Sequence, residues 1–166
     1  AMAKVMYTIA NRPMVEHVVD LAHDLHASRV VAIVGWQKDT VIDHLRQKKK
    51  AVTCVEQNPQ LGTGHAIMQA EAPLDGFFGD VLVLSGDVPL LKRSTVQSLL
   101  AFHRTEPAAA TILTAVLDDP TGYGRILRTE GGGCVTGIVE HKDATEEQRH
   151  IREINSGIYV FDKQRL

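Results

Sequence analysis

The sequence predicts an α/β fold built on a mixed, mostly parallel sheet. A short, wholly apolar and β-branched run at 30–34 is typical of a strand that is covered on both faces, and 80–84 indicates another buried strand. Amphipathic stretches, such as 13–27, alternate with these strands, and their apolar residues recur at helical spacing. Strands that alternate with helices indicate βαβ units and therefore parallel pairing.

The remaining elements follow from the same patterns in chain order. Pro13 suits the first turn of the first helix, and glycines open a later helix at 62–72. From Ala108 onward, glycine-rich turns replace the helices, so the last strands are expected to be antiparallel. The other predicted elements are a helix at 39–48, strands at 51–55, 111–117, 124–129, 134–140 and 154–161, and a helix carrying Val96, Leu99 and Leu100.

Length, composition and net charge limit the class of protein to which the chain can belong. The 166 residues carry a formal net charge of −2, so they fit one domain and lack the basic excess of a nucleic-acid-binding protein. No apolar run approaches the roughly 18 residues of a membrane span, and the start of the chain lacks a secretory signal. Cys54 and Cys134 could meet in space, but they are expected to be buried, unpaired thiols, as in a cytoplasmic protein with no membrane partner.

Asp87 is the first candidate for chemistry. It follows the predicted strand 80–84, which ends in Leu82-Val83-Leu84, through Ser85 and Gly86, and ligands of open parallel sheets bind beyond the carboxyl ends of the strands. A carboxylate there suits Mg²⁺, which prefers oxygen ligands. Asp87 could equally well be a turn residue that caps the loop before Pro89.

Three other segments are weaker candidates when taken alone. Residues 57–66 follow a strand and open a helix, where backbone N–H groups attract anions, yet an unliganded helix-starting turn is the simpler interpretation. Gly124 lies in a turn-rich segment, and Asn155 interrupts an apolar strand, which indicates a hydrogen-bonding duty or an exposed edge. His23 and His26 lack the cysteine or acidic partners of a zinc site, so no zinc is expected.

Taken together, these segments resemble the bacterial N-acetylglucosamine-1-phosphate uridyltransferase family. The resemblance runs from Lys4 to about Phe161. It rests on five strings in the same order and similar spacing: Leu61-Gly62-Thr63-Gly64-His65-Ala66, Gly86-Asp87-Val88-Pro89-Leu90, Asp118-Asp119-Pro120-Thr121-Gly122-Tyr123-Gly124-Arg125-Ile126, Gly137-Ile138-Val139-Glu140-His141-Lys142-Asp143-Ala144 and Ile154-Asn155-Ser156-Gly157-Ile158.

The resemblance implies a Rossmann-like, glycosyltransferase-A-like nucleotidyltransferase. Such a domain joins UTP to N-acetylglucosamine 1-phosphate with Mg²⁺, giving UDP-N-acetylglucosamine and pyrophosphate for peptidoglycan and lipopolysaccharide precursors. It also implies a role for each matching residue: Lys4 and Asp87 as catalytic groups, Asp87 as the metal ligand, Lys4, Gln57, Gly62, Thr63, Ser85 and Gly86 with the nucleotide, and Gly124, Glu140 and Asn155 with the sugar.

The sequence also departs from the family pattern. The family's first apolar strand and Gly-rich loop have no counterpart here, Ser85 stands where relatives often carry Tyr, and a downstream metal-binding asparagine and the β-helix acetyltransferase domain are absent. We therefore expect residues 1–166 to form one partial domain, with a nucleotide-binding half at 1–107 and a sugar-binding half at 108–166. We also expect this chain to have little or no activity by itself.

Two alternatives stay open. Another sugar nucleotidyltransferase would use glucose 1-phosphate or a different base. A non-catalytic nucleotide-sugar-binding module would bind the product without turnover, as the missing phosphate loop suggests. The sequence leaves open whether the parent protein is a homo-oligomer.

Overall fold

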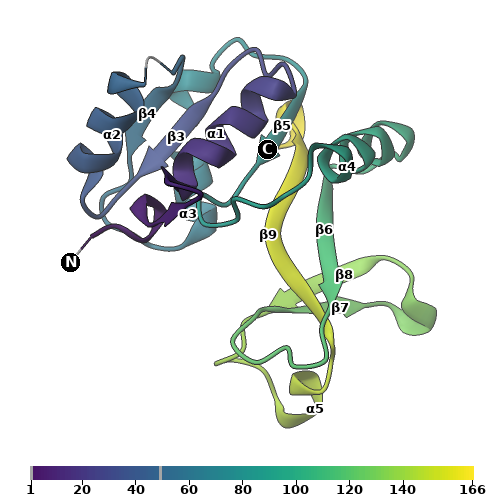
Figure 1. Ribbon diagram of the computed structural model, residues 1–166. Coiled ribbons are helices and arrows are strands. Elements are labelled where there is room, and N and C mark those ends of the chain that lie inside the picture. The colour runs from purple at the N-terminus through teal and green to yellow at the C-terminus, as the bar shows by residue number, and fades with distance from the viewer. Residues whose placement is uncertain (1, 49) are drawn as a thin grey trace. The chain divides into compact units, whose positions relative to one another are not determined.

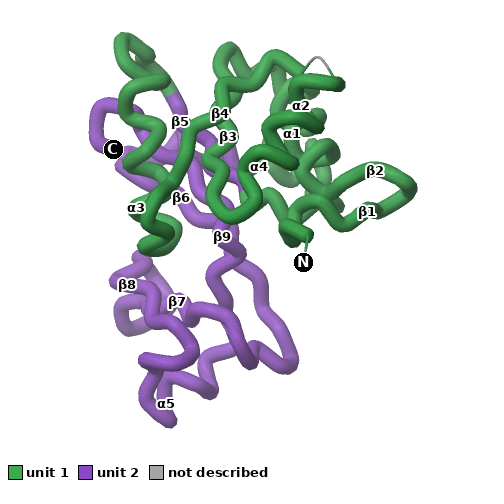
Figure 2. The backbone as a smooth tube through the Cα atoms, turned by 90° about the vertical axis from the view of Figure 1, so that its left-hand side faces the viewer, with its two compact units in different colours: residues 1–79, 85–98 green, residues 80–84, 99–166 purple. Residues whose placement is uncertain are grey.

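The computed structural model describes residues 2–48 and 50–166 (Figure 1). The chain divides into two compact units (Figure 2). Unit 1 comprises residues 1–79 and 85–98, and unit 2 comprises residues 80–84 and 99–166. The functional halves expected at 1–107 and 108–166 stay a prediction.

Unit 1 begins with short elements and continues as a βαβ unit. Strands β3 and β4 pair in parallel, with Val31 opposite Thr53 and Val34 opposite Glu56. A helix between two adjacent strands supplies the crossover that parallel pairing requires. The elements are η1 (Lys4–Met6), β1 (Thr8–Ile9), β2 (Arg12–Pro13), α1 (Met14–Asp24), β3 (Val31–Val34), α2 (Lys38–Gln47), β4 (Thr53–Glu56), α3 (Thr63–Met68) and η2 (Ala72–Leu74).

The core of unit 1 forms where α1, which precedes the βαβ unit, and α2, its crossover helix, bury their apolar faces. Val15 and Val19 of α1 and Val41 and Leu45 of α2 pack with Val34 of β3. Leu45 is 1% exposed. The helical periodicity noted in the sequence therefore corresponds to the buried faces of α1 and α2.

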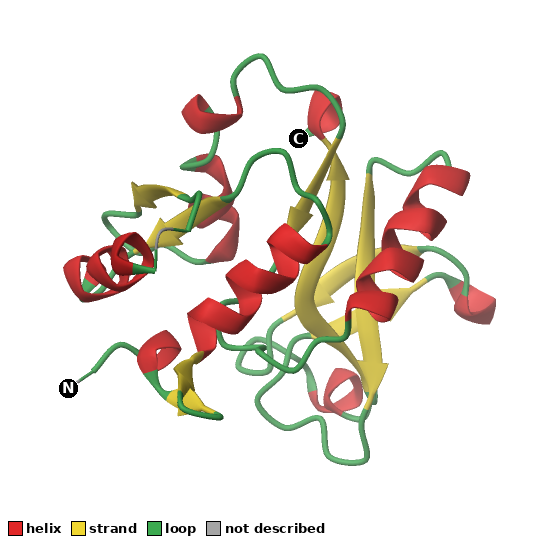
Figure 3. Cartoon of the chain, turned by 45° about the horizontal axis from the view of Figure 1, so that its top comes forward, coloured by secondary structure: helices red, strands yellow, loops and turns green. Residues whose placement is uncertain are grey.

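Unit 2 contains a five-stranded sheet. Its central strand β9 pairs with β5, β6 and β7, and β8 pairs with β7, as the long yellow strand in Figure 1 shows. Figure 3 shows the strands and helices by colour. The elements from here on are β5 (Asp80–Val83), α4 (Arg93–Thr105, which begins in unit 1), β6 (Ala110–Val116), β7 (Arg125–Arg128), η3 (Glu130–Gly132), β8 (Val135–Val139), α5 (Glu146–Arg149), β9 (Glu153–Asp162) and η4 (Lys163–Arg165).

The α/β prediction is confirmed, but the prediction of a mostly parallel sheet is wrong for the part of the chain that the structure describes. There, β3 and β4 form the parallel pair, whereas every pair in the five-stranded sheet is antiparallel. The apolar run of β5 was expected to extend the parallel arrangement, yet β5 pairs with β9, about 80 residues later. Hydrophobic runs predict that a strand exists and do not predict its partner.

Strand β9 carries a β-bulge against β6. Leu113 pairs with Ile158, whereas the next residue, Thr114, pairs with Asn155. Ser156 and Gly157 are therefore extra residues on β9. Gly157 has φ = 76°, a conformation that glycine adopts readily and that bulges require.

Cys54 and Cys134 are free thiols as expected, but Cys54 is half-buried and Cys134 is exposed, so the expectation that both are buried is wrong. Over residues 2–48 and 50–166, no helix combines the length and the apolar character that crossing a membrane requires.

Candidate functional site

The candidate residues fall into three groups, each inside one unit. Two groups belong to unit 1, namely the Asp87 cluster (Lys4, Ser85, Gly86, Asp87) and the glycine loop (residues 57–64). The third, the Gly124 cluster (Gly124, Glu140, Asn155), belongs to unit 2.

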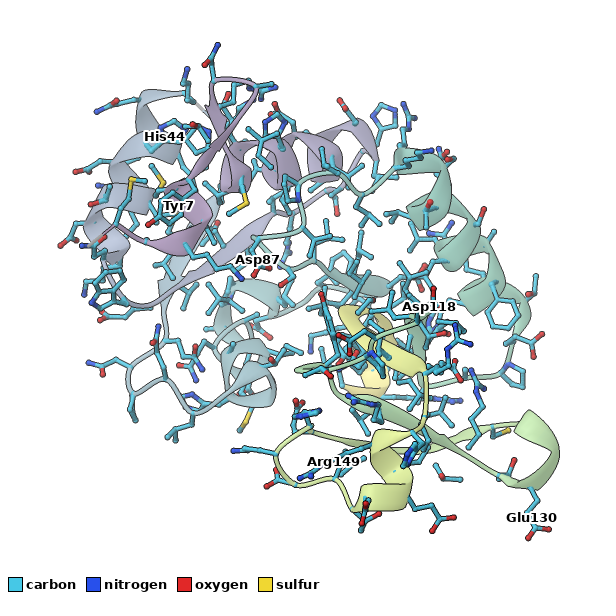
Figure 4. The ribbon with its side chains drawn as sticks, turned by 60° about the horizontal axis from the view of Figure 1, so that its bottom comes forward. Tyr7, His44, Asp87, Asp118, Glu130 and Arg149 are labelled. Atoms are coloured by element: carbon cyan, nitrogen blue, oxygen red, sulfur yellow. The ribbon has the colours of Figure 1, made fainter. Side chains whose placement is uncertain are left out.

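The Asp87 cluster joins two segments that are 83 positions apart. Lys4 Nζ donates to Asp87 Oδ2 at 2.7 Å, and Ser85 Oγ donates to Asp87 Oδ1 at 2.9 Å. Figure 4 shows Asp87 on the loop that follows β5. Gly86 packs so closely on this side that an added Cβ would lie 3.1 Å from Val5 Cγ1.

The electrostatics of this cluster keep Asp87 ionised. The ammonium of Lys4 lowers the pKa of the Asp87 carboxyl below its ordinary value; partial burial opposes that shift, and the Ser85 hydroxyl adds to it. Asp87 is 29% exposed at its side chain and Lys4 is 75% exposed, so the pair is open to solvent and ligands. An ionised, accessible carboxylate beside a cation can bind a divalent metal and a phosphate group.

In the glycine loop, Gln57 is oriented by two acceptors. Its Nε2 donates to the Gly62 carbonyl at 2.9 Å and contacts His65 Nδ1 at 3.1 Å. The Gly62 carbonyl can only accept, which fixes the amide with its nitrogen toward the loop. Gly62 has φ = 98° and precedes Thr63, the first residue of α3.

In the Gly124 cluster, Gly124 directly precedes β7, Glu140 directly follows β8, and Asn155 lies in β9. An added Cβ at Gly124 would lie 3.4 Å from Glu140 Oε1 and 3.6 Å from Asn155 Cβ. The Asn155 N–H donates to the Gly124 carbonyl at 2.9 Å. The three residues predicted to bind sugar are therefore neighbours, although 31 positions separate the first from the last.

Sequence reasoning gave no role to several side chains that support these groups. Tyr159 Oη accepts a hydrogen bond of 2.6 Å from Asn155 Nδ2, and His65 contacts Gln57. Arg125, which is 1% exposed, donates to the Tyr123 carbonyl, His141 Nδ1 and the Arg149 carbonyl. His65, Arg125 and His141 stood inside the quoted strings, but nothing in their spacing revealed these partners.

No group of three or more His, Cys, Asp and Glu side chains that could hold a metal ion occurs among residues 2–48 and 50–166. The α1 helix ends at Asp24, and His26 lies beyond it with φ = 58°. The helix predicted over 13–27 therefore ends earlier than expected, and His26 lies outside it.

Fold and site together describe an α/β domain with a cation–carboxylate pair, a glycine loop and a polar cluster on a second sheet. The chain belongs to the nucleotidyl transferase family, whose model matches residues 1–166. It is 50% identical over 163 residues to the bifunctional protein GlmU of Listeria monocytogenes, and 46% identical over 164 residues to that of Cutibacterium acnes. The resemblance stated from the sequence motifs is confirmed.

These relatives are longer than the chain. The matches cover 98% and 99% of the chain but only 35% and 39% of the two relatives, respectively. Among solved structures, the chain resembles UDP-glucose pyrophosphorylase from Acinetobacter baumanii, with a TM-score of 0.74 and 22% identity over 98% of this chain and 68% of that one. HddC from Yersinia pseudotuberculosis gives a TM-score of 0.69 at 23% identity over the same shares. These structures support the fold.

Proposed function

We propose that this domain transfers a uridylyl group from UTP to N-acetylglucosamine 1-phosphate. The products are UDP-N-acetylglucosamine, a precursor of peptidoglycan and lipopolysaccharide, and pyrophosphate. The observation that carries the proposal is the Lys4–Asp87 pair, 2.7 Å apart, in a chain that shares half its residues with GlmU proteins. Because UTP is an intracellular nucleotide, we place the reaction in the cytoplasm.

The reaction needs alignment and charge neutralisation more than covalent help. A phosphate oxygen of the sugar phosphate forms a bond to the α-phosphorus of UTP. The bond from that phosphorus to the bridging oxygen breaks, and pyrophosphate leaves with the electron pair. Negative charge spreads over the phosphoryl oxygens, so a fixed cation such as Lys4 stabilises the transition state.

Asp87 fits the role of a Mg²⁺ ligand. Each carboxylate oxygen has two lone pairs, and the contacts with Lys4 and Ser85 use one on each oxygen. Mg²⁺ commonly takes one or two carboxylates together with substrate phosphates and water. When bound, the ion would neutralise phosphate charge beside Lys4.

The hydrogen-bond inventory of Gln57 supports recognition of uracil. The amide nitrogen of Gln57 donates to the Gly62 carbonyl, so its carbonyl Oε1 is the group that can accept from a base. That carbonyl accepts from the N3–H of uracil, whereas N3 of cytosine has no proton to donate. Gly62 and Thr63 border the same loop and leave room for a flat ring, because a Cβ at Gly62 would meet nothing within 4 Å.

The Gly124 cluster supports binding of the amino sugar. Glu140 is exposed, and Asn155 is half-buried. A carboxylate accepts from sugar hydroxyls, and a side-chain amide pairs with hydroxyl or acetamido groups. A sugar that left these groups unpaired would bind less well.

Two measurements on the 166-residue chain test the proposal. The first is pyrophosphate release from UTP and N-acetylglucosamine 1-phosphate with Mg²⁺, with glucose 1-phosphate and CTP as competitors. The second is calorimetric titration with UDP-N-acetylglucosamine. Turnover with these two substrates supports the transferase, and binding without turnover supports a nucleotide-sugar-binding module. Absence of both would refute the proposed function.

A further inference from the structure

Asn155 lies at the bulge of β9, and the bulge brings a second side chain within its reach. Four residues of extended strand span about 13 Å, too far for ordinary contact between the first and last side chains. The two extra residues, Ser156 and Gly157, shorten the path from Asn155 to Tyr159. As a result Asn155 Nδ2 donates to Tyr159 Oη at 2.6 Å.

The amide of Asn155 is fixed at both ends. The Gly157 N–H donates to Asn155 Oδ1 at 2.9 Å. A backbone N–H can only donate, so the oxygen must face Gly157 and the nitrogen must face Tyr159. One N–H and one carbonyl lone pair of Asn155 then remain for a ligand.

Tyr159 is itself firmly placed. It lies in the central strand, paired with Val83 of β5 and Ile112 of β6. Its ring stacks on Phe161 with centroids 5.7 Å apart and an interplanar angle of 25°. The hydroxyl therefore presents a stationary acceptor to Asn155.

The oriented amide belongs to the Gly124 cluster. The Asn155 main-chain N–H donates to the Gly124 carbonyl, and the Asn155 Cβ lies 3.6 Å from where a Gly124 Cβ would stand. Gly124 thus fixes the main chain of Asn155, while Gly157 of the bulge and Tyr159 fix its side-chain amide. Without the tyrosine hydroxyl, the amide nitrogen would lose its fixed partner.

We propose that Tyr159 is a positioning residue for sugar recognition, which orients the Asn155 amide for an N-acetylated sugar phosphate. The inference rests on the proposed function. It assigns Tyr159 an effect on the sugar phosphate and none on UTP, because its contact runs through Asn155.

A double-mutant cycle tests the proposal, with calorimetric affinity for N-acetylglucosamine 1-phosphate and, separately, for UTP. Tyr159→Phe removes the hydroxyl and keeps the stacked ring; we expect about fivefold to tenfold weaker binding of the sugar phosphate, the effect of one hydrogen bond. UTP affinity should stay unchanged. In an Asn155→Ala background, Tyr159→Phe should cause no further loss. Unchanged binding by Tyr159→Phe, or fully additive losses, would overturn the proposal.

Tyr7→Phe, in unit 1, is the matched hydroxyl deletion and should leave sugar-phosphate affinity unchanged. If the unmodified chain bound no sugar phosphate at all, the proposed function would fail, and the side-chain amide signals of Asn155 in a ¹⁵N–¹H spectrum would decide the positioning role. Shifted, faster-exchanging signals in Tyr159→Phe support it, and identical signals refute it.

Discussion

At the scale of single residues, the Asp87 cluster ties the proposed chemistry to one carboxylate between a lysine and a serine. Asp87→Asn keeps the shape and removes the negative charge that Lys4 contacts at 2.7 Å. We expect the variant to bind UTP at least as tightly as the unmodified chain in EDTA, because Lys4 then faces less competition for phosphate. With Mg²⁺, only the unmodified chain should gain affinity. Calorimetric titration of UTP in EDTA and in Mg²⁺ measures both, and an equal Mg²⁺ gain in both proteins would rule out Asp87 as a metal ligand.

Arg125 illustrates how a buried cation is held by backbone carbonyls. It is 1% exposed, donates to two carbonyls and to His141, and its Nε has no hydrogen-bond partner. Arg125→Ala would leave these acceptors unpaired around a cavity, and we expect a loss of about 3–5 kcal/mol in the free energy of unfolding. Arg125→Met refills the volume and should lose less, about 1–3 kcal/mol. Urea unfolding of both variants checks this, and equal losses would show that the cavity contributes nothing.

At the scale of elements, α1 ends in a conformation that its sequence does not predict. The Ala27 N–H donates to the Ala22 carbonyl and the His26 N–H to the His23 carbonyl, which is the Schellman pattern. His26 occupies the left-handed position, φ = 58°, that glycine usually fills. His26→Gly should therefore stabilise the chain by about 0.5–1 kcal/mol in urea unfolding. Ala22→Gly, inside the helix, should instead destabilise it by about 1 kcal/mol, and a destabilising His26→Gly would contradict the strain argument.

The same element explains which features the sequence could predict. Apolar periodicity located α1 and β3 to within a few residues, since buried faces leave a local pattern. The predicted helix runs on to residue 27 because no glycine or asparagine follows Asp24 to mark the end of the helix. Helix α5 is not among the predicted elements, although Thr145 and Gln148 have the spacing of a capping box and form one in the structure.

In the candidate site, too, the sequence predicts some of the contacts and not others. Gln57 and Gly62 are five positions apart in one motif, which predicts that they act at the same place. In the structure, a hydrogen bond links them. The contact of Lys4 with Asp87 and the bulge that links Asn155 to Tyr159 depend on tertiary pairing. No local pattern encodes such pairing, because it depends on which strands meet rather than on where they begin.

At the scale of the whole molecule, stability should depend on acidity through carboxylates in both units. In unit 1, burial alone would raise the pKa of Glu16, but hydrogen bonds from Arg12 and His44 outweigh burial and lower it below the ordinary value. In unit 2, the Arg128 guanidinium lowers the pKa of Glu153. Carboxyls with a depressed folded-state pKa add stability above their unfolded pKa, and that stability is lost as pH falls through the folded pKa.

Urea midpoints should therefore be nearly flat from pH 8 to about pH 5 and fall below about pH 4.5, the ordinary range for a glutamate. Glu16→Gln should lower the free energy of unfolding at neutral pH by about 1–3 kcal/mol and make its decline in acid shallower, because that carboxyl no longer titrates. Trp36, the one tryptophan in the sequence, lies in unit 1, so its fluorescence follows that unit while circular dichroism follows the whole chain. Glu16→Gln should shift the fluorescence transition to lower urea at neutral pH, and the shift should shrink in acid, where Glu16 of the unmodified chain becomes protonated. A decline as steep as that of the unmodified chain would exclude Glu16 as a source of acid sensitivity, and coincidence of the two probes would show that both units unfold as one cooperative system.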